Sequence, residues 1–365
     1  MKRVLCVLSE INQGGAETFI MKLMRSMDKS QYMIDFCAMT DIIGVYEKEI
    51  EALGGKIYHV TPKTKNPVKS FFDIRKVVKQ GKYQYALRLN NHAVTVIDLL
   101  ACRAGGAKRL IMRTTNSGNS GSFSIILHKI LKFLPMLVPN VMIAPSKEAG
   151  IYTFGEKAVS EGKVEILQNG LDISEYAYNE GKRNELRQKL NISHDTFVLG
   201  HIGRFTQVKN HSFIIQVFKK LLTKKPDAKL LLIGKGELEE DIKSLAKEKG
   251  VFKNVIFAGT KSDAASYYSV MDALILPSLY EGMPNVVIEA QASGLKCVVS
   301  DTVTKQADIT GLCSYLSLSD NIDLWVDTLL EGENFTRKDT KEDFIKAGYD
   351  IQSVCKRFIQ LIFGE

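Results

Sequence analysis

Short apolar segments alternate with segments of helical periodicity along this chain, and the alternation runs through two successive series. Each apolar run ends in a turn and is followed by apolar residues at helical spacing, which is the pattern of strands connected by helices. Such alternation predicts parallel sheets that are wrapped by helices. The first series spans residues 2–146 and the second spans residues 197–301. Because 365 residues are more than one ordinary core requires, we expect an α/β protein with two Rossmann-like domains.

A polar, turn-rich segment, residues 161–195, lies between the two series and is expected to contain the connection between the domains. We therefore assign residues 1–168 to an N-terminal domain and residues 169–345 to a C-terminal domain. The final stretch, residues 341–365, has apolar positions at helical intervals and is predicted to be helical. Its last part, residues 346–365, is assigned to a separate C-terminal helix.

The composition excludes several classes of protein. A chain that is 45% hydrophobic and 25% charged is typical of a soluble globular protein. Its six cysteines are scattered without a Cys-x-x-Cys pair, which argues against structural zinc and disulfides and favours a reducing cytoplasm. No stretch approaches the ~20 apolar residues of a transmembrane helix. The apolar run Val4–Leu8 is too short for a signal peptide, so we expect a cytoplasmic protein.

The positive charge of the chain is confined to its first half. Residues 1–170 contain 24 Lys and Arg against 14 Asp and Glu, whereas residues 171–365 contain 25 against 27. This asymmetry suggests an anionic partner, which could be nucleic acid, an anionic membrane surface or a phosphorylated acceptor. A solvated basic face without a partner is the alternative. Nucleic acid is disfavoured because the tyrosines and phenylalanines follow core periodicity and form no stacking platform.

Two stretches of the first half could lie on an anionic membrane. Residues 61–82, TPKTKNPVKSFFDIRKVVKQGK, mix cations with aromatic residues. Residues 123–140, FSIILHKILKFLPMLVPN, place His128, Lys129 and Lys132 among large apolar residues. Core helices with a charged outer face would give the same pattern.

Ligands of open α/β sheets bind at the carboxyl ends of strands, where helix N-termini offer free amide groups. Gly14 and Gly15 follow the first apolar run and would let the backbone approach a ligand, although a simple tight turn is the alternative. Arg204 and Lys209 follow the first strand of the second series, and two such cations could clamp a diphosphate. As an alternative they are ordinary surface charges.

The stretch SLYEGMPNVVIEA, residues 278–290, places one glutamate on each side of an expected helix start. Glu281 would lie in the loop after a strand, and Glu289 would lie in a helix whose first turn contains Pro284. The amides near this helix start, those of Gly282, Met283 and Asn285, attract an anion. The two carboxylates could then accept hydrogen bonds from sugar hydroxyls. Alternatively, Glu281 caps the turn and Glu289 pairs with a lysine.

Five segments in this order resemble motifs of the retaining glycosyltransferases of family 4, which adopt the GT-B fold. EGMPNVVIEA resembles their Glu-x7-Glu motif, GRFTQVKNHSF their phosphate loop, QNGLDISEY their domain junction, APSKEAGIYTFG the end of their first domain, and GGAETF their first glycine loop. The resemblance implies two Rossmann-like domains that face each other across a cleft, with a C-terminal helix that crosses back to the first domain. It is strongest to transferases that build capsular or exopolysaccharide repeat units.

The resemblance also implies roles for individual residues. Arg204 and Lys209 would neutralise the diphosphate of a nucleotide-sugar, Glu289 would bind the ribose hydroxyls, and Glu281 would contact the transferred sugar. His92 stands at the place of an active-site histidine of the family, although it could be an ordinary histidine at a strand end. The implied catalytic set is therefore Glu281, His92, Arg204 and Lys209.

Further binding residues follow from the same resemblance. Thr260 and Lys261 would lie beside the base, and Gly14 and Gly15 would close over the diphosphate. The whole nucleotide-sugar set is Gly14, Gly15, Arg204, Lys209, Thr260, Lys261, Glu281, Gly282, Met283, Pro284, Asn285 and Glu289.

Two segments depart from the family pattern. Residues 113–116 read Arg-Thr-Thr-Asn where the family commonly has a histidine, which leaves the acceptor chemistry at that point open. Lys296 replaces a usual proline, and we expect it to affect only the start of a strand.

The expected activity is retaining transfer of a hexose or N-acetylhexosamine from a UDP-sugar to a glycan or polyprenyl-diphosphate-linked acceptor. No Asp-x-Asp follows a predicted strand, so no metal or other cofactor is expected. With no obvious covalent nucleophile, front-face attack by the acceptor hydroxyl is the expected route. The alternatives are a GDP-mannose-dependent mannosyltransferase and a UDP-sugar epimerase of the same fold. We expect the enzyme in the cytoplasm, with a possible peripheral position on the inner face of the cell membrane.

Overall fold

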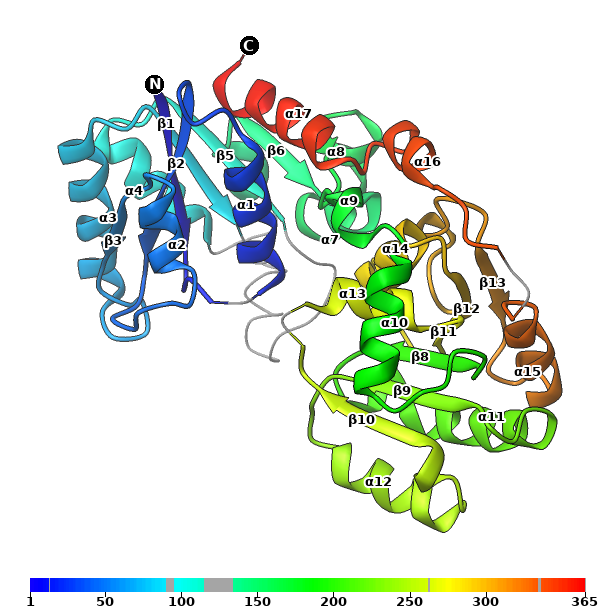
Figure 1. Cartoon of the computed structure of the whole chain (residues 1–365). Coiled ribbons are helices and arrows are strands. Elements are labelled where there is room, and N and C mark those ends of the chain that lie inside the picture. Colours follow the sequence, from blue (N-terminus) through cyan, green and yellow to red (C-terminus); the bar gives the residue numbers. More distant parts are fainter. Residues whose placement is uncertain (13, 90–94, 115–133, 262, 334–335, 365) are drawn as a thin grey trace. The chain divides into compact units, whose positions relative to one another are not determined.

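The computed structural model describes the chain except for residues 13, 90–94, 115–133, 262, 334–335 and 365 (Figure 1). The described residues form two compact units, each with its own sheet. Unit 1 consists of residues 1–171 and 348–365, and unit 2 consists of residues 172–347.

Unit 1 contains a sheet of seven parallel strands among its described residues, in the order β3-β2-β1-β4-β5-β6-β7. The chain moves outward from β1 to β3 and then resumes on the other side of β1 with β4. The carboxyl ends of β1 and β4 therefore form a topological switch point, where ligands of such sheets bind. The strands are β1 (Lys2–Leu8), β2 (Tyr32–Ala38), β3 (Ile57–His59), β4 (Tyr85–Leu89), β5 (Arg109–Arg113), β6 (Val141–Ala144) and β7 (Val164–Ile166).

Strand β1 shows why this sheet is covered on both faces. Val4, Cys6 and Leu8 belong to one apolar cluster, and Leu5 and Val7 belong to a second one. Successive side chains of a strand point to opposite faces, so a continuous apolar run buries both of them. Helices pack over the two clusters. They are α1 (Gly15–Ser26), α2 (Glu47–Ala52), α3 (Pro67–Gly81), α4 (Val96–Gly105), α7 (Lys147–Phe154), α8 (Glu156–Ser160) and α17 (Ile351–Phe363). Unit 1 also contains the four-residue helix α6 (Leu134–Leu137).

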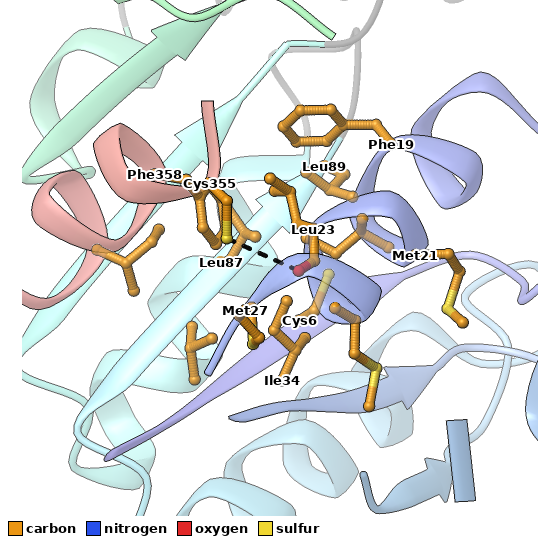
Figure 2. Packing of buried hydrophobic residues seen from close by; sticks show 14 of the residues in the cluster. Cys6, Phe19, Met21, Leu23, Met27, Ile34, Leu87, Leu89, Cys355 and Phe358 are labelled. Atoms are coloured by element: carbon orange, nitrogen blue, oxygen red, sulfur yellow. Dashed lines mark hydrogen bonds between the residues drawn. The ribbon is translucent and has the colours of Figure 1, made fainter. Parts of the chain in front are cut away.

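The C-terminal helix α17 packs on the sheet of unit 1, as predicted for this fold (Figure 2). The ring of Phe358 lies 6.2 Å from that of Phe19 in an edge-on contact, and Cys355 lies against the carbonyl of Leu23. The predicted C-terminal helix differs in one respect. It begins at Ile351, because Gly348 takes a positive φ of 73° and separates it from the short helix α16 (Lys341–Lys346) of unit 2.

Unit 2 contains a sheet of six parallel strands among its described residues, in the order β10-β9-β8-β11-β12-β13. Its switch point lies at the carboxyl ends of β8 and β11. The strands are β8 (Val198–Ile202), β9 (Lys229–Ile233), β10 (Val255–Gly259), β11 (Ala273–Leu276), β12 (Lys296–Ser300) and β13 (Cys313–Leu316). The α-helices, besides α16, are α9 (Ile173–Tyr176), α10 (Glu180–Lys189), α11 (His211–Lys224), α12 (Glu239–Glu248), α13 (Ala264–Val270), α14 (Asn285–Ala292) and α15 (Ile322–Leu330).

The segment 161–195 is more ordered than its polar sequence suggests, because it contains β7, α9 and α10. Arg187 of α10 is buried and donates to Asp272 at 2.8 Å, and Arg183 donates to the same carboxylate at 2.7 Å. Helix α10 is thus fixed by buried ion pairs, which apolar periodicity cannot reveal. Lys296 is the first residue of β12. Within the described part of the chain, no helix is both long and apolar enough to cross a membrane.

Candidate functional site

A lysine and a glutamate meet at the switch point of unit 2. Lys209 ends the short 3₁₀ turn Gln207–Lys209 that follows β8, and Glu281 lies in the loop that follows β11. Lys209 Nζ lies 2.5 Å from Glu281 Oε1, and the two side chains are only 20% and 15% exposed. A close ion pair with so little exposure is weakly screened by solvent. Two of the predicted catalytic residues therefore form one charged unit.

The loop that carries Glu281 is anchored by hydrogen bonds. The Ser278 hydroxyl donates to Glu281 Oε1 at 2.9 Å, so the carboxylate closes its own turn and also pairs with Lys209. The carbonyl of Ser278 accepts bonds from the hydroxyls of Ser300 at 2.6 Å and Thr302 at 2.7 Å. These contacts fix the carboxylate on a rigid element, which preorganised electrostatics requires.

Arg204 is placed differently from Lys209. Its side chain is 75% exposed, and its guanidinium lies 3.6 Å from the exposed carboxylate of Glu237. A surface pair at this distance contributes little to stability, so Arg204 can turn to another anion at low cost. The structure therefore gives one cation, Lys209, in a close ion pair and a second, Arg204, whose guanidinium is exposed and only weakly paired.

Two glycines after β9 make room for the loop that carries Arg204. Gly234 has a φ of 142°, and a Cβ atom there would lie 2.0 Å from the carbonyl oxygen of Gly203. A Cβ atom on Gly236 would lie 2.4 Å from the carbonyl oxygen of Phe205. Backbone packs directly on backbone here, so these positions require glycine.

Helix α14 begins one residue later than predicted. Asn285 is its first residue and Pro284 is the N-cap, because the ψ of Pro284 is 93° and its carbonyl accepts the first intrahelical bond, from Val287 at 3.0 Å. The amides of Asn285 and Val286 have no intrahelical acceptor at such a start. The half-buried Gly282 and the first turn of α14 therefore still form a helix end that favours an anion.

Glu289 lies beside two tyrosines that were not predicted, the buried Tyr268 and the half-buried Tyr176. The Tyr268 hydroxyl of α13 donates to Glu289 Oε2 at 2.8 Å. The ring of Tyr176, from α9, lies 6.1 Å from that of Tyr268 and also faces this carboxylate. Burial, and then the nearby Glu289 charge, raise the pKa of both tyrosines, so they remain hydrogen-bond donors.

Two buried histidines lie behind Lys209. The rings of His201 and His211 are 4.7 Å apart, and His201 Nδ1 bonds the carbonyl of Ile275 at 2.9 Å, which connects β8 to β11. Burial, with Lys209 as a second cause, lowers the pKa of His211 to about 4, and burial lowers that of His201 well below its usual value. Both rings are therefore neutral near pH 7 and add no charge to the site.

Thr260 and Lys261 lie at the same edge of the sheet, directly after β10. With neighbouring strands ~4.8 Å apart, β10 is ~14 Å from β11, so the predicted residues are spread over about this length of the sheet edge. Lys261 Nζ lies 5.6 Å from the centre of the Tyr267 ring. The predicted residues of unit 2 thus line one edge of one sheet.

The predicted residues of unit 1 are placed only in part. Gly14 is the N-cap of α1 and Gly15 its first residue, at the carboxyl end of β1. A Cβ atom on Gly15 would meet no atom within 4 Å, so packing does not require glycine there. His92 lies outside the described residues, as do His128, Lys129 and Lys132.

Arg113 and Thr114, the first two residues of the segment that departs from the family pattern, are both buried. Arg113 is buried, its guanidinium lies 3.6 Å above the centre of the Phe19 ring, and it donates to Asn169 at 2.8 Å. Burial lowers the pKa of Arg113 to about 9. The Thr114 hydroxyl bonds that of Thr153 at 2.7 Å. Both side chains therefore pack and form hydrogen bonds in the interior of unit 1. Residues 115 and 116 lie outside the described residues.

The comparisons with known proteins agree on one family. The family model for "Glycosyl transferases group 1" matches residues 182–349. EpsF of Bacillus subtilis, a protein named as a glycosyltransferase, is 33% identical over 361 residues, covering 96% of this chain and 94% of EpsF. The chain belongs to the group 1 glycosyltransferases. A second relative of this glycosyltransferase, 22% identical over 323 residues and covering 85% and 84% of the two chains, comes from Campylobacter jejuni. Its name describes an N-acetylgalactosaminyltransferase that acts on a diphospho-undecaprenol-linked sugar.

Solved structures confirm the predicted fold of this glycosyltransferase. HepE of Anabaena, solved in complex with UDP, aligns with a TM-score of 0.79 at 16% identity and covers 100% of both chains. At this identity the likeness shows the fold alone, which is GT-B. Among the described residues, no group of three or more His, Cys, Asp or Glu could hold a metal ion.

Proposed function

We propose that this enzyme is a retaining glycosyltransferase of family 4 that moves a hexose or N-acetylhexosamine from a UDP-sugar to a glycan or polyprenyl-diphosphate-linked acceptor. Its place would be in capsular or exopolysaccharide synthesis at the inner face of the cell membrane. The observation that carries this proposal is the Lys209–Glu281 pair beside the start of α14. The UDP in the HepE structure supports the donor, and the name of the Campylobacter relative supports a lipid-linked acceptor.

The charges of the site suit cleavage of a sugar–diphosphate bond. Negative charge grows on the diphosphate as the anomeric C–O bond breaks, and positive charge grows on the sugar ring. Lys209, Arg204 and the amides of the α14 start would stabilise the diphosphate. Glu281 would bind the transferred sugar and stabilise its positive charge, while Glu289 would bind the ribose hydroxyls. In this mechanism the acceptor hydroxyl attacks the front face of the sugar, which retains the anomeric configuration.

The ion pair adds a step to donor binding. Without donor, Lys209 is neutralised by Glu281, which lies 2.5 Å away. A diphosphate that enters the site competes with this carboxylate for the ammonium group. As Lys209 turns toward the phosphate, Glu281 is released in part and gains capacity to accept a bond from the donor sugar. Binding of the phosphate and capture of the sugar would thus be coupled through one hydrogen-bond donor, the Lys209 ammonium group.

Donor identity can be tested by titration calorimetry with a panel of UDP- and GDP-sugars. We expect UDP-sugars to bind at least about tenfold more tightly than GDP-mannose, a difference of about 1.4 kcal/mol. Proton NMR of the glycoside product should show the anomeric configuration of the donor. A preference for GDP-mannose would favour the mannosyltransferase alternative. Conversion of a UDP-sugar to its epimer without acceptor would favour the epimerase.

Tyr268→Phe tests the role of Glu289. The variant removes the hydroxyl that orients the carboxylate, and a hydrogen bond to a charged group contributes about 1.5–3 kcal/mol. We expect UDP affinity to fall by about tenfold, with a smaller change in turnover at saturating donor. Calorimetry with UDP measures the first quantity. Tyr315→Phe, in the same unit but bonded to the carbonyl of Thr304, serves as the control. Unchanged UDP binding in Tyr268→Phe would remove the proposed contact between Glu289 and the nucleotide.

A further inference from the structure

Large apolar side chains of unit 1 are exposed on two neighbouring segments. Ile42, Ile43 and Val45 lie in the loop after β2, and Val68 and Phe72 lie in the first two turns of α3. These five side chains are between 54% and 78% exposed. Isolated exposed apolar residues are ordinary, but five on adjoining segments mark an interaction surface.

The helix does not need these residues for its own packing. Helix α3 buries Ser70, Ile74 and Val78 against the core, whereas Val68 and Phe72 stand four positions apart on another face. They are therefore left to solvent by the fold of unit 1 itself. We name the surface formed by residues 41–45 and by the exposed residues of 61–82 the α3 face.

The α3 face is strongly basic. Residues 61–82 contain seven Lys and Arg against one Asp. That aspartate, Asp73, accepts two bonds from Thr61, which lower its pKa. The basic side chains are largely unused by the fold, because none of the following four forms an ion pair with a described residue: Lys69, Lys76, Lys79 and Lys82.

An ion pair and a shared hollow connect the two segments within unit 1. Lys65 Nζ lies 2.5 Å from Asp41 Oδ2 and joins the loop to the start of α3. A hollow of about 400 Å³ lies between them, with His59 and Lys69 among its lining residues. Both segments follow the carboxyl ends of β2 and β3. The loop 41–45 and the start of α3 therefore lie at the edge of the sheet that also carries the β1–β4 switch point.

We propose that the α3 face docks this enzyme onto a bilayer that contains anionic phospholipid. Apolar side chains would enter the interface between headgroups and acyl chains, and the lysines would contact the phosphates around them. The combination decides the partner, because charge alone would suit any polyanion and apolar area alone would suit a protein. This inference rests on the proposed function only for its purpose, which is to bring unit 1 to a lipid-linked acceptor.

Vesicle flotation of the purified full chain tests the proposal. We expect binding to phosphatidylcholine vesicles that contain phosphatidylglycerol, at least about tenfold weaker binding to phosphatidylcholine alone, and loss of binding at high salt. Each lysine near an anionic surface contributes about fivefold, so Lys69→Glu with Lys76→Glu should lower binding by well over tenfold. Val68→Ser with Phe72→Ser should also lower it by at least about tenfold.

A matched control comes from unit 2, where Phe252 is also exposed beside an exposed lysine. Phe252→Ser with Lys253→Glu should bind vesicles like the wild type. Circular dichroism of each variant verifies that the exposed substitutions leave the fold intact. Turnover of a water-soluble acceptor should be unchanged in all of them.

Three results would overturn the α3 face as a membrane surface. They are equal wild-type binding to neutral and anionic vesicles, wild-type-like binding by both α3 variants, and lipid-free self-association that the α3 variants abolish. The third would assign the face to a second copy of the chain. Since flotation needs neither donor nor transfer, vesicle binding without any glycosyltransfer from UDP-sugars would refute the proposed donor and leave this inference standing.

Discussion

Glu281→Ala is expected to lower the turnover number by about 100- to 1,000-fold, as removal of one preorganised electrostatic group does in other enzymes. UDP affinity should stay within about threefold of the wild type or increase, because Lys209 would no longer be shared with a carboxylate 2.5 Å away. Steady-state rates at saturating UDP-sugar and acceptor measure the first quantity, and calorimetry with UDP measures the second. A large loss of turnover without a loss of UDP affinity would assign Glu281 to the reacting sugar.

Glu237→Ala is the matched control for this experiment. Its carboxylate also faces a predicted phosphate-binding cation, Arg204, but at 3.6 Å and on the surface. Its removal should change turnover by less than about threefold. If Glu281→Ala instead lost UDP affinity and turnover in equal proportion, the carboxylate would be holding the nucleotide site together, and its proposed contact with the sugar would be wrong.

The site could be predicted from the sequence where its residues lie within a few positions of one another. The loop with Arg204 and Lys209, and the segment from Glu281 to Glu289, follow strands of the same sheet and lie at the same edge of it. Their order along the chain and the rules for parallel sheets are sufficient for that prediction.

The partners of these residues could not be predicted. Lys209 and Glu281 are 72 positions apart, so their ion pair depends on strand order, which places β11 next to β8. The bond from Tyr268 to Glu289 depends likewise on how α13 packs beside α14. Sequence periodicity specifies which side of a helix is buried, but it does not specify which buried polar groups will meet.

The fold shows the same division between local and distant signals. Apolar runs identified β1 and β8, whose side chains are buried on both faces. The helix α10 was missed because Arg187, its buried residue, is held by Asp272 and not by apolar contacts. The break before α17 was missed because a helical pattern continues on both sides of Gly348. In both cases a single residue overrides the periodicity of its segment.

Gly234→Ala should strongly destabilise unit 2. The new Cβ atom would lie 2.0 Å from the carbonyl oxygen of Gly203, and the φ of 142° is unfavourable for any residue with a side chain. Because the clash is with backbone, relief requires movement of the whole 203–205 loop. We expect the free energy of unfolding to fall by about 3–5 kcal/mol.

The unfolding of unit 2 has its own reporter, because Trp325, the single tryptophan of the chain, is buried in the unit 2 core. Urea titration followed by Trp325 fluorescence therefore measures this stability. Gly250→Ala is the control, since its φ is also positive at 76° but its Cβ would meet no atom within 4 Å. Gly250→Ala should lower the free energy of unfolding by only about 1–2 kcal/mol. If the two variants lost equal free energy of unfolding, the 203–205 loop would be moving away from the new Cβ atom at little energetic cost, which would contradict the prediction. Folded Gly234→Ala should in addition bind UDP more weakly, because the displaced loop is the one that carries Arg204.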